Sequence, residues 1–288
     1  MDDIELAYEV IGEGEPVVLI HPGLAVDGFV LLIPRLAETG RYRLIHYHRA
    51  GYGGSSRPAG PVSLADHASH CRALLRHLGF ERAHVVGHSS GGNIALQLAL
   101  DAPELVHTLA LLEPAIVHVP SGPQLGQEVI LPARQRFESG DPAGAVDTFL
   151  RGVAGPGYRE SVGKGLPPGA FARLVEAAGT FFGVELPAVR AWTLTPDDAA
   201  RITQPALAVV GERTRGRGFR LPGATRPGAQ PAAARRGVHP AGGRSSPARR
   251  EPGRDGRGPS STSSPATRSG RAAEPGRDPC LPVPGPVG

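Results

Sequence analysis

The segment Gly-His-Ser-Ser-Gly-Gly at residues 87–92 combines residue types and spacing that could do chemistry. Residues 83–86 before it form an apolar run typical of a buried strand, and residues 93–100 after it carry apolar side chains at helical spacing. A serine between a strand and a helix lies on a sharp turn, with its hydroxyl projecting from the end of a sheet. We therefore predict that Ser89 is a nucleophile.

Gly87 and Gly91 flank this serine. A Cβ atom at either position would collide with the neighbouring strand or helix, so both positions require glycine. The bare G-x-S-x-G pattern also occurs in ordinary turns. The strand before it and the helix after it are what favour catalysis here.

The length and composition of the chain limit its class. Its 288 residues suffice for one large α/β domain with a helical insert. There is no run of about eighteen apolar residues, which excludes a membrane span, and residues 1–5 lack the pattern of a secretory signal. Two cysteines, Cys71 and Cys280, argue against a disulfide framework and a zinc site. We expect a cytoplasmic protein without metal or cofactor, and the oligomeric state stays open.

Charge divides the chain into two dissimilar parts. Residues 1–213 carry 17 basic and 23 acidic side chains, whereas residues 214–288 carry 14 basic and 4 acidic ones. The formal net charge of +4 therefore averages an acidic body and a strongly basic tail. The tail is rich in Gly, Ala, Pro, Arg and Ser, with Phe219 as its sole aromatic, a composition typical of disorder.

Apolar runs of strand length alternate with helical patterns along the body. We expect strands at 4–10, 16–20, 42–47, 83–86, 106–112 and 205–211, and helices at 29–36, 64–78 and 93–100. From residue 115 to about 200 the pattern changes to helical stretches broken by Gly and Pro, among them 128–137, 143–153 and 168–178. Strands that alternate with helices predict a parallel sheet with right-handed crossovers, here with a helical cap before the last strand.

Several motifs in this order give residues 4–213 a resemblance to the α/β-hydrolase family. They are the His-Pro-Gly turn at 21–23, the loop at 49–55, the turn around Ser89 and the strand at 205–211. The resemblance implies an α/β fold, with a mostly parallel α/β-hydrolase sheet and a helical cap insertion, incomplete at the C-terminus. The implied parts are a core at 1–114, a cap at 115–200, a return to the core at 201–213 and a tail at 214–288.

The resemblance also implies an oxyanion hole made of two backbone N–H groups. One belongs to Ser90 and the other to Gly23 or Leu24, because Pro22 has no N–H. Loss of one such donor in a hydrolase weakens transition-state stabilisation by about 3–4 kcal/mol. The turn departs from the commoner His-Gly of the family, and His48 stands where relatives often have an acidic residue. The plainer interpretation of the segment at 21–23 is a tight turn without a catalytic role, and we expect His21 to be structural.

The triad acid has two candidates, Glu113 and Glu212. Many relatives place an aspartate three residues after the glycine that ends the strand at 205–211, and this chain has Thr214 there. Glu113 directly follows the strand at 106–112, a site from which some capped relatives supply the carboxylate, and we favour it. A solvated or helix-capping role for Glu113 is the alternative.

The triad base is missing from its expected place. In the family the order is nucleophile, acid and histidine, and the histidine follows the last strand. Beyond Gly211 the chain has only His239, which no apolar run precedes. The other candidates come too early in that order: His84, His88, His107 and His118. A histidine at position 88 is typically a wall residue beside the nucleophile.

A frameshift near Thr214 would explain both the tail and the missing histidine. Gly, Ala, Pro and Arg are the GGN, GCN, CCN and CGN codons, so a GC-rich gene read out of frame gives this mixture. With the variable bases chosen freely, a shift of one base lets residues 236–258 read as an apolar strand, a Gly-Ala-Gly-His turn and a helix start. The frameshift is a hypothesis that this compatibility supports.

These features predict a serine hydrolase of a small ester or similar acyl substrate, impaired here because the base is missing. Dehalogenases and epoxide hydrolases of the family use aspartate in place of Ser89 and are disfavoured. A non-catalytic homologue that binds a small molecule is the alternative within the fold. Nucleic-acid binding through the Arg/Gly segment at 213–220 is disfavoured, because the tail has no lysine and no further aromatic to stack on bases.

Overall fold

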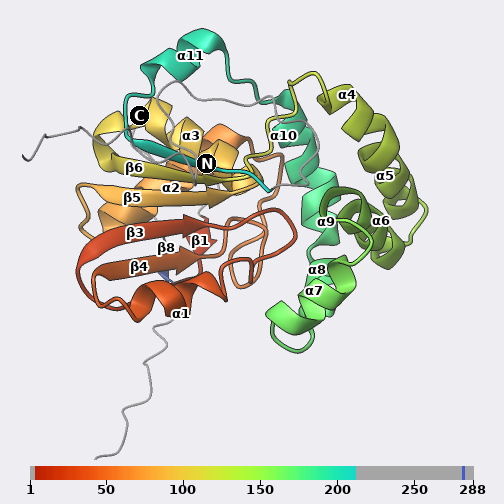
Figure 1. Ribbon diagram of the computed structural model, residues 1–288, viewed down its shortest axis with the longest axis horizontal. Helices are drawn as coiled ribbons and strands as arrows, with labels where there is room; N and C mark the ends of the chain where they lie inside the picture. The colour runs from red at the N-terminus through yellow and green to blue at the C-terminus, as the bar shows by residue number, and fades with distance from the viewer. Residues whose placement is uncertain (1–3, 212–280, 283–288) are drawn as a thin grey trace, which may run out of the picture. The chain divides into compact units, whose positions relative to one another are not determined.

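A six-stranded sheet runs through the part of the chain that the computed structural model describes, residues 4–211 and 281–282 (Figure 1). Its strand order is β2-β4-β3-β5-β6-β7, in which β2 is antiparallel to β4 and the other neighbours are parallel. The strands are β2 (Tyr8–Ile11), β3 (Glu15–Ile20), β4 (Tyr42–Tyr47), β5 (Ala83–His88), β6 (Val106–Leu112) and β7 (Ala206–Val209). The predicted, mostly parallel α/β sheet is confirmed.

The strand expected at 4–10 divides at Ala7 into β1 (Glu5–Leu6) and β2. The Ala7 N–H donates to Ser55 Oγ at 2.9 Å, which takes this residue out of the strand pairing. β1 pairs antiparallel with β8 (Leu281–Pro282). Apart from these two residues, the predictions for the tail at 214–288 lie outside the described residues.

Helices pack on both faces of the sheet, because successive side chains of a strand point to opposite faces. α2 (Leu64–His77) and α3 (Ser90–Asp101) share a buried core with Val18 and Val85 on one face. α1 (Leu32–Ala37) packs with Leu19 and Leu44 on the other face. The short helix η1 (Pro103–Leu105) leads into β6.

Of the two helices predicted before Ser89, α2 begins at the predicted residue and α1 does not. α2 begins at Leu64 as expected, and a capping box precedes it: Ser63 Oγ accepts from the Asp66 N–H at 3.1 Å, and the Asp66 carboxylate accepts from the Ser63 N–H at 2.8 Å. α1 begins three residues later than expected, because residues 26–31 form turns. Phe29 therefore reaches the core from a turn and not from a helix.

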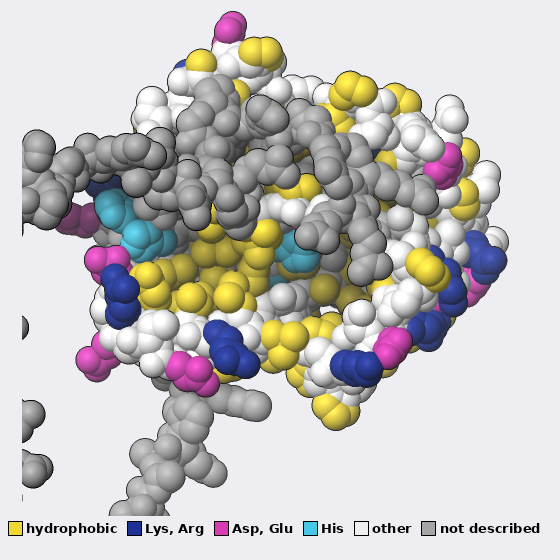
Figure 2. All heavy atoms as spheres, in the orientation of Figure 1, with side chains coloured by type: hydrophobic (Ala, Val, Ile, Leu, Met, Phe, Trp, Pro, Cys, Tyr) yellow, Lys and Arg dark blue, Asp and Glu magenta, His cyan; other side chains and the backbone are white. Residues whose placement is uncertain are grey.

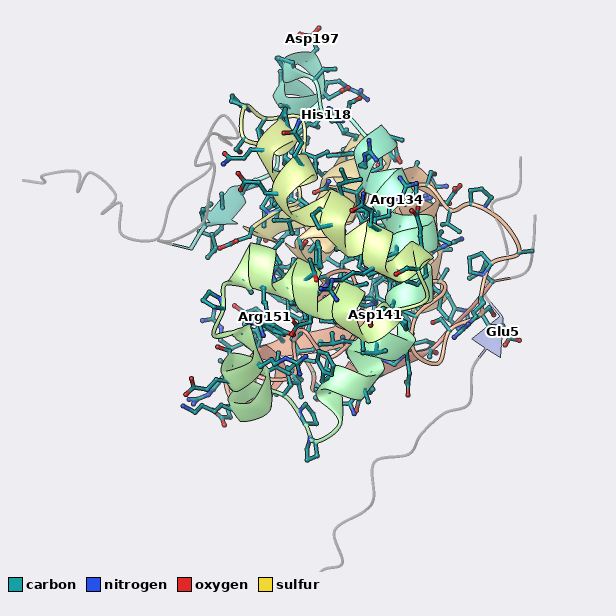
Figure 3. The ribbon with its side chains drawn as sticks, turned by 90° about the vertical axis from the view of Figure 1, so that its right-hand side faces the viewer. Glu5, His118, Arg134, Asp141, Arg151 and Asp197 are labelled. Carbon is teal, nitrogen blue, oxygen red and sulfur yellow. The ribbon has the colours of Figure 1, made fainter. Side chains whose placement is uncertain are left out.

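A helical cap lies between β6 and β7. Its elements are α4 (Gly122–Leu125), the π-helical segment η2 (Gly126–Ile130), α5 (Leu131–Glu138), α6 (Pro142–Ala154), α7 (Tyr158–Gly165), α8 (Ala170–Glu176), α9 (Ala178–Thr180), the π-helical segment η3 (Phe181–Glu185), α10 (Leu186–Ala191) and α11 (Pro196–Arg201). Figure 3 looks onto this cap, with Arg134 on α5 and Arg151 on α6. The cap has an apolar cluster of its own, and Leu24 from the sheet domain inserts into it.

One face of the sheet stays partly exposed along β5, β6 and β7. The strand registers place Val86 beside Ala110, and Ala110 beside Leu207. Val86 and Ala110 are half-buried, and Leu207 is 38% exposed. Apolar side chains also gather over the strands in the middle of the view in Figure 2. We name the row Val86, Ala110 and Leu207 the open row.

Candidate active site

Ser89 lies on a strained turn between β5 and α3. Its backbone angles are φ 54° and ψ −123°, a conformation that residues with a Cβ atom rarely adopt. Backbone strain of this kind amounts to about 1–3 kcal/mol and is found mainly at functional sites. A hydrogen bond joins the turn to the end of β6: the Ser89 N–H donates to Leu112 O at 3.0 Å.

The glycines beside Ser89 allow the turn to form. A Cβ atom on Gly87 would lie far inside van der Waals contact with the Gly91 carbonyl in α3. A Cβ atom on Gly91 would overlap the carbonyl oxygen of Ile20 at the end of β3. The predicted reason for both glycines, collision with a neighbouring helix or strand, is confirmed.

His21 fixes the turn that follows β3. Its Nε2 accepts from the Arg49 N–H at 3.1 Å, so Nδ1 carries the proton and donates to Pro22 O at 2.8 Å. The side chain is fully buried, and burial together with the nearby Arg49 charge holds its pKa well below the ordinary value. Both ring nitrogens are engaged with the backbone, which agrees with the structural role expected for His21.

The structure brings two of the predicted oxyanion residues together. The Gly23 N–H donates to Ser90 Oγ at 3.0 Å, so the turn after β3 contacts the residue that follows Ser89. A substrate oxygen that used this N–H would have to displace the Ser90 hydroxyl. Leu24 has a positive φ of 65°, and its backbone lies near the Tyr52 hydroxyl. Of the two alternatives for the second donor, Gly23 is therefore the one beside the Ser89 turn.

Glu113 lies at the same edge of the sheet, directly after β6. Its φ is 46°, and its N–H donates to Val209 O at 2.8 Å. Its Oε1 accepts from the Gly211 N–H at 2.6 Å. The other candidate acid, Glu212, lies outside the described residues, as do Thr214 and His239.

The early histidines lie in different places relative to Ser89. His84 is near the N-terminal end of β5, where it contacts Glu15 at 2.9 Å and Thr108 at 2.7 Å, and the His107 ring lies 4.7 Å from the His84 ring. That is the opposite end of the strand from Ser89. The Nε2 atom of His118 is 3.2 Å from Arg190 O.

His88 directly precedes Ser89. Burial lowers its pKa, and the nearby Glu113 carboxylate acts in the opposite direction.

A buried polar cluster next to the turn at His21 was not predicted from the sequence. Arg49 Nη2 donates to both carboxylate oxygens of Glu185, at 2.9 and 3.1 Å, and the Tyr52 hydroxyl donates to the same carboxylate. Arg49 and Glu185 are 0% and 1% exposed. We name Arg49, Tyr52 and Glu185 the Arg49 cluster. The sequence pointed only to the loop at 49–55. It gave no sign of Glu185, because this residue comes from the cap, 136 residues after Arg49.

In residues 4–211, no group of three or more His, Cys, Asp or Glu side chains could hold a metal ion. None of the helices described above is long and apolar enough to cross a membrane.

A sequence model of the alpha/beta hydrolase fold matches residues 16–149, which run from β3 to α6 and include Ser89 and Glu113. Over these residues the chain matches the alpha/beta hydrolase family. The strained serine turn, the mostly parallel sheet and the cap thus form an alpha/beta hydrolase fold, and the resemblance noted in the sequence is confirmed.

Curated relatives match part of the chain. RutD of Azorhizobium caulinodans, a carbamate hydrolase by name, is 39% identical over 111 residues, which are 38% of this chain and 41% of that protein. A fluoroacetate dehalogenase from a Burkholderia species is 37% identical over 118 residues, 38% of each chain. The chain thus spans about two fifths of the length of these relatives.

A solved structure agrees over a longer stretch. The enol-lactonase of Burkholderia xenovorans matches with a TM-score of 0.61 at 22% identity, and the match covers 73% of this chain and 78% of that chain. A likeness at this level of identity shows the fold alone.

Proposed function

We propose that this α/β hydrolase acts by acyl transfer to Ser89. The Ser89 oxygen attacks the carbonyl carbon of a small ester or related acyl substrate, and the N–H groups of Ser90 and Gly23 stabilise the negative charge that develops on the carbonyl oxygen. A histidine that the written sequence lacks would take the serine proton and return it to the leaving group, with Glu113 orienting the imidazole. Water then releases the acyl group.

The strained turn at Ser89 is the observation that carries this proposal. A serine held at φ 54°, between a strand and a helix and bonded to the end of β6 that Glu113 follows, supports a nucleophilic role. The relatives include both a carbamate hydrolase and a dehalogenase by name. A serine at position 89 favours acyl chemistry over dehalogenation. The same composition that predicts no disulfide framework supports a cytoplasmic location.

We further propose that the chain as written is impaired. Its only histidine after Gly211 is His239, and the histidines at 84 and 107 lie at the far end of the sheet. Without a base, a serine triad retains only the rate enhancement from the oxyanion hole and from binding, a loss of about 10⁴–10⁶ in kcat.

The open row supports the proposed frameshift. In a complete sheet of this family a last strand and a closing helix follow β7, and that helix would cover an apolar face. Val86, Ala110 and Leu207 form a partly exposed apolar row on β5 to β7, as expected if that helix is missing from the written sequence. Sequencing the coding DNA from Val209 to the stop codon, read in all three frames, tests this. A single base that restores a strand, a histidine and a helix supports it, and an unbroken frame without them contradicts it.

Covalent labelling tests the serine chemistry. The full chain and a frame-restored chain are treated with a fluorophosphonate, with Ser89→Ala as the matched control, and hydrolysis of p-nitrophenyl butyrate is followed in parallel. We expect labelling at Ser89 and hydrolysis by the frame-restored chain, and at most slow labelling of the chain as written. If neither chain reacts at Ser89, the proposal is wrong, and the non-catalytic binding alternative gains support.

A further inference from the structure

The Arg49 cluster joins the cap to the sheet domain at the turn that carries Gly23. Arg49 and Tyr52 come from the loop after β4, whereas Glu185 ends the π-helical segment η3 of the cap. The Arg49 guanidinium also lies over the Tyr52 ring, 4.9 Å from its centroid. The proposed acyl transfer uses none of these three side chains directly.

Three of the four residues in the turn at 21–24 lie against this cluster or the Ser89 turn. The Arg49 backbone N–H donates to His21 Nε2 at 3.1 Å, the Leu24 backbone lies near the Tyr52 hydroxyl, and the Gly23 N–H donates to Ser90 Oγ at 3.0 Å. The turn is therefore fixed from three sides. A displacement of the Arg49 cluster would move the Gly23 N–H relative to Ser89.

The cap packs directly on Gly23. A Cβ atom at this position would lie 2.6 Å from Phe181 Cε2 and 3.1 Å from Glu185 Oε1, so the cap segment η3 leaves no room for a side chain there. Close packing of this kind transmits small shifts, because there is no space in which to absorb them. The position of η3 and the position of the Gly23 N–H are thus coupled.

The buried ion pair between Arg49 and Glu185 favours this position of the cap. Arg49 is fully buried, and within the described structure its Nε and Nη1 atoms have no hydrogen-bond partner. Glu185 supplies the carboxylate that compensates the guanidinium charge. Removal of one partner of a buried ion pair is strongly destabilising, because the other charge stays buried and uncompensated.

We propose that Glu185 and Tyr52 are positioning residues, which set the Gly23 N–H for the oxyanion through the docked cap. This inference rests on the proposed acyl transfer at Ser89. The reaction then needs the cap docked on the sheet domain, because the Glu185 carboxylate of the cap supports the turn that carries the Gly23 N–H. The Ser89 turn itself has its own support from β6.

Amide hydrogen exchange of Gly23, measured by NMR on the full chain, tests the positioning role. Tyr52→Phe removes the hydroxyl between the carboxylate and Leu24 but takes no partner from the Gly23 N–H. We expect exchange at Gly23 to become about tenfold faster or more in this variant and in Glu185→Gln. Glu185→Asp keeps the charge and should restore part of the protection. Tyr52→Phe keeps the test valid if Glu185→Gln does not fold.

Arg173→Gln is the matched control. Arg173 Nε pairs with Asp27 at 2.7 Å and is a second link between the cap and the sheet domain, one that uses no residue of the Arg49 cluster. We expect Gly23 exchange in Arg173→Gln to stay within about twofold of the unaltered chain. Unchanged exchange in both Tyr52→Phe and Glu185→Gln, or equal acceleration in Arg173→Gln, would overturn the proposal.

A functional readout separates this inference from the proposed function. Where the chain labels at Ser89, Tyr52→Phe should slow the fluorophosphonate reaction about tenfold, with Arg173→Gln close to the unaltered chain. Equal labelling rates in Tyr52→Phe and the unaltered chain would contradict the positioning role. If no variant labels at all, acyl transfer at Ser89 fails, and Gly23 exchange still decides whether the cluster holds the turn.

Discussion

Glu113 Oε1 accepts a hydrogen bond from the Gly211 N–H at 2.6 Å, so the carboxylate that follows β6 reaches across the end of β7. The Ser89 N–H is bonded to Leu112 O, the residue just before Glu113. The serine turn and this glutamate therefore share one edge of the sheet. This juxtaposition supports the proposed role of Glu113 as triad acid, and it also places a carboxylate near His88.

Glu113→Gln should lower the pKa of His88. Burial already lowers this pKa, and the Glu113 carboxylate opposes that shift because it favours the charged imidazolium. With the neutral amide, the imidazolium loses that stabilisation, and protonation of His88 moves to lower pH. An NMR titration of the His88 ring measures the change. Glu104→Gln, at an exposed glutamate paired with Arg76, is the control, and an unchanged His88 titration in Glu113→Gln would contradict the prediction.

Ser89→Gly should be more stable than Ser89→Ala. Both variants remove the hydroxyl, but only glycine relieves the strain of φ 54° and ψ −123°. The strain amounts to about 1–3 kcal/mol, and the extra freedom of glycine in the unfolded chain offsets about 0.5–1 kcal/mol of it. The free energy of unfolding in urea should therefore be about 1 kcal/mol higher for Ser89→Gly. Equal stability of the two variants would show that the turn is not strained.

Gly91→Ala should lower the free energy of unfolding by about 1–3 kcal/mol, because its Cβ overlaps the Ile20 carbonyl and the helix must shift away from β3. Gly163→Ala is the matched control, since nothing lies within 4 Å of that Cβ position on α7. There we expect a gain of up to about 1 kcal/mol from helix propensity. The comparison fails if the two alanine variants have the same stability.

The sheet could be predicted because its buried strands are marked in the sequence. β4 and β6 begin and end at the predicted residues, since each has an apolar run of strand length in the sequence. The start of α1 could not be predicted. Phe29 has the apolar character of a helix position, but it fills the core from a turn, and Leu31 beside it is 63% exposed. Local patterns do not distinguish these two ways of burying one aromatic ring.

Some residues of the candidate site could likewise be predicted from the sequence, and others could not. Ser89, Gly87 and Gly91 are close in sequence, and their spacing carries the steric reason for the turn. Glu185 contacts Arg49 only because the cap folds back over the sheet, and no local pattern in η3 marks its glutamate as buried. A pair this far apart depends on tertiary packing, and its existence has to be seen in the structure.

Stability should fall as the pH drops below about 6.5, the ordinary pKa of histidine. His67 on α2 is 3% exposed, and burial holds its pKa well below that value, so the unfolded chain takes up a proton that the folded chain does not. Stability then rises with pH across this window. His67→Leu should reduce the slope of the free energy of unfolding by as much as about 1.4 kcal/mol per pH unit. His21 contributes in the same direction, so part of the slope should remain.

Urea unfolding from pH 5.0 to 7.5 would measure this slope, at about half-unit steps. Leu64→Met, a buried apolar exchange on the same helix, is the control for repacking. It should change stability by less than about 1.5 kcal/mol at every pH and leave the slope as it is. If His67→Leu and the unaltered chain have the same slope, the buried His67 is not the group that couples proton uptake to unfolding.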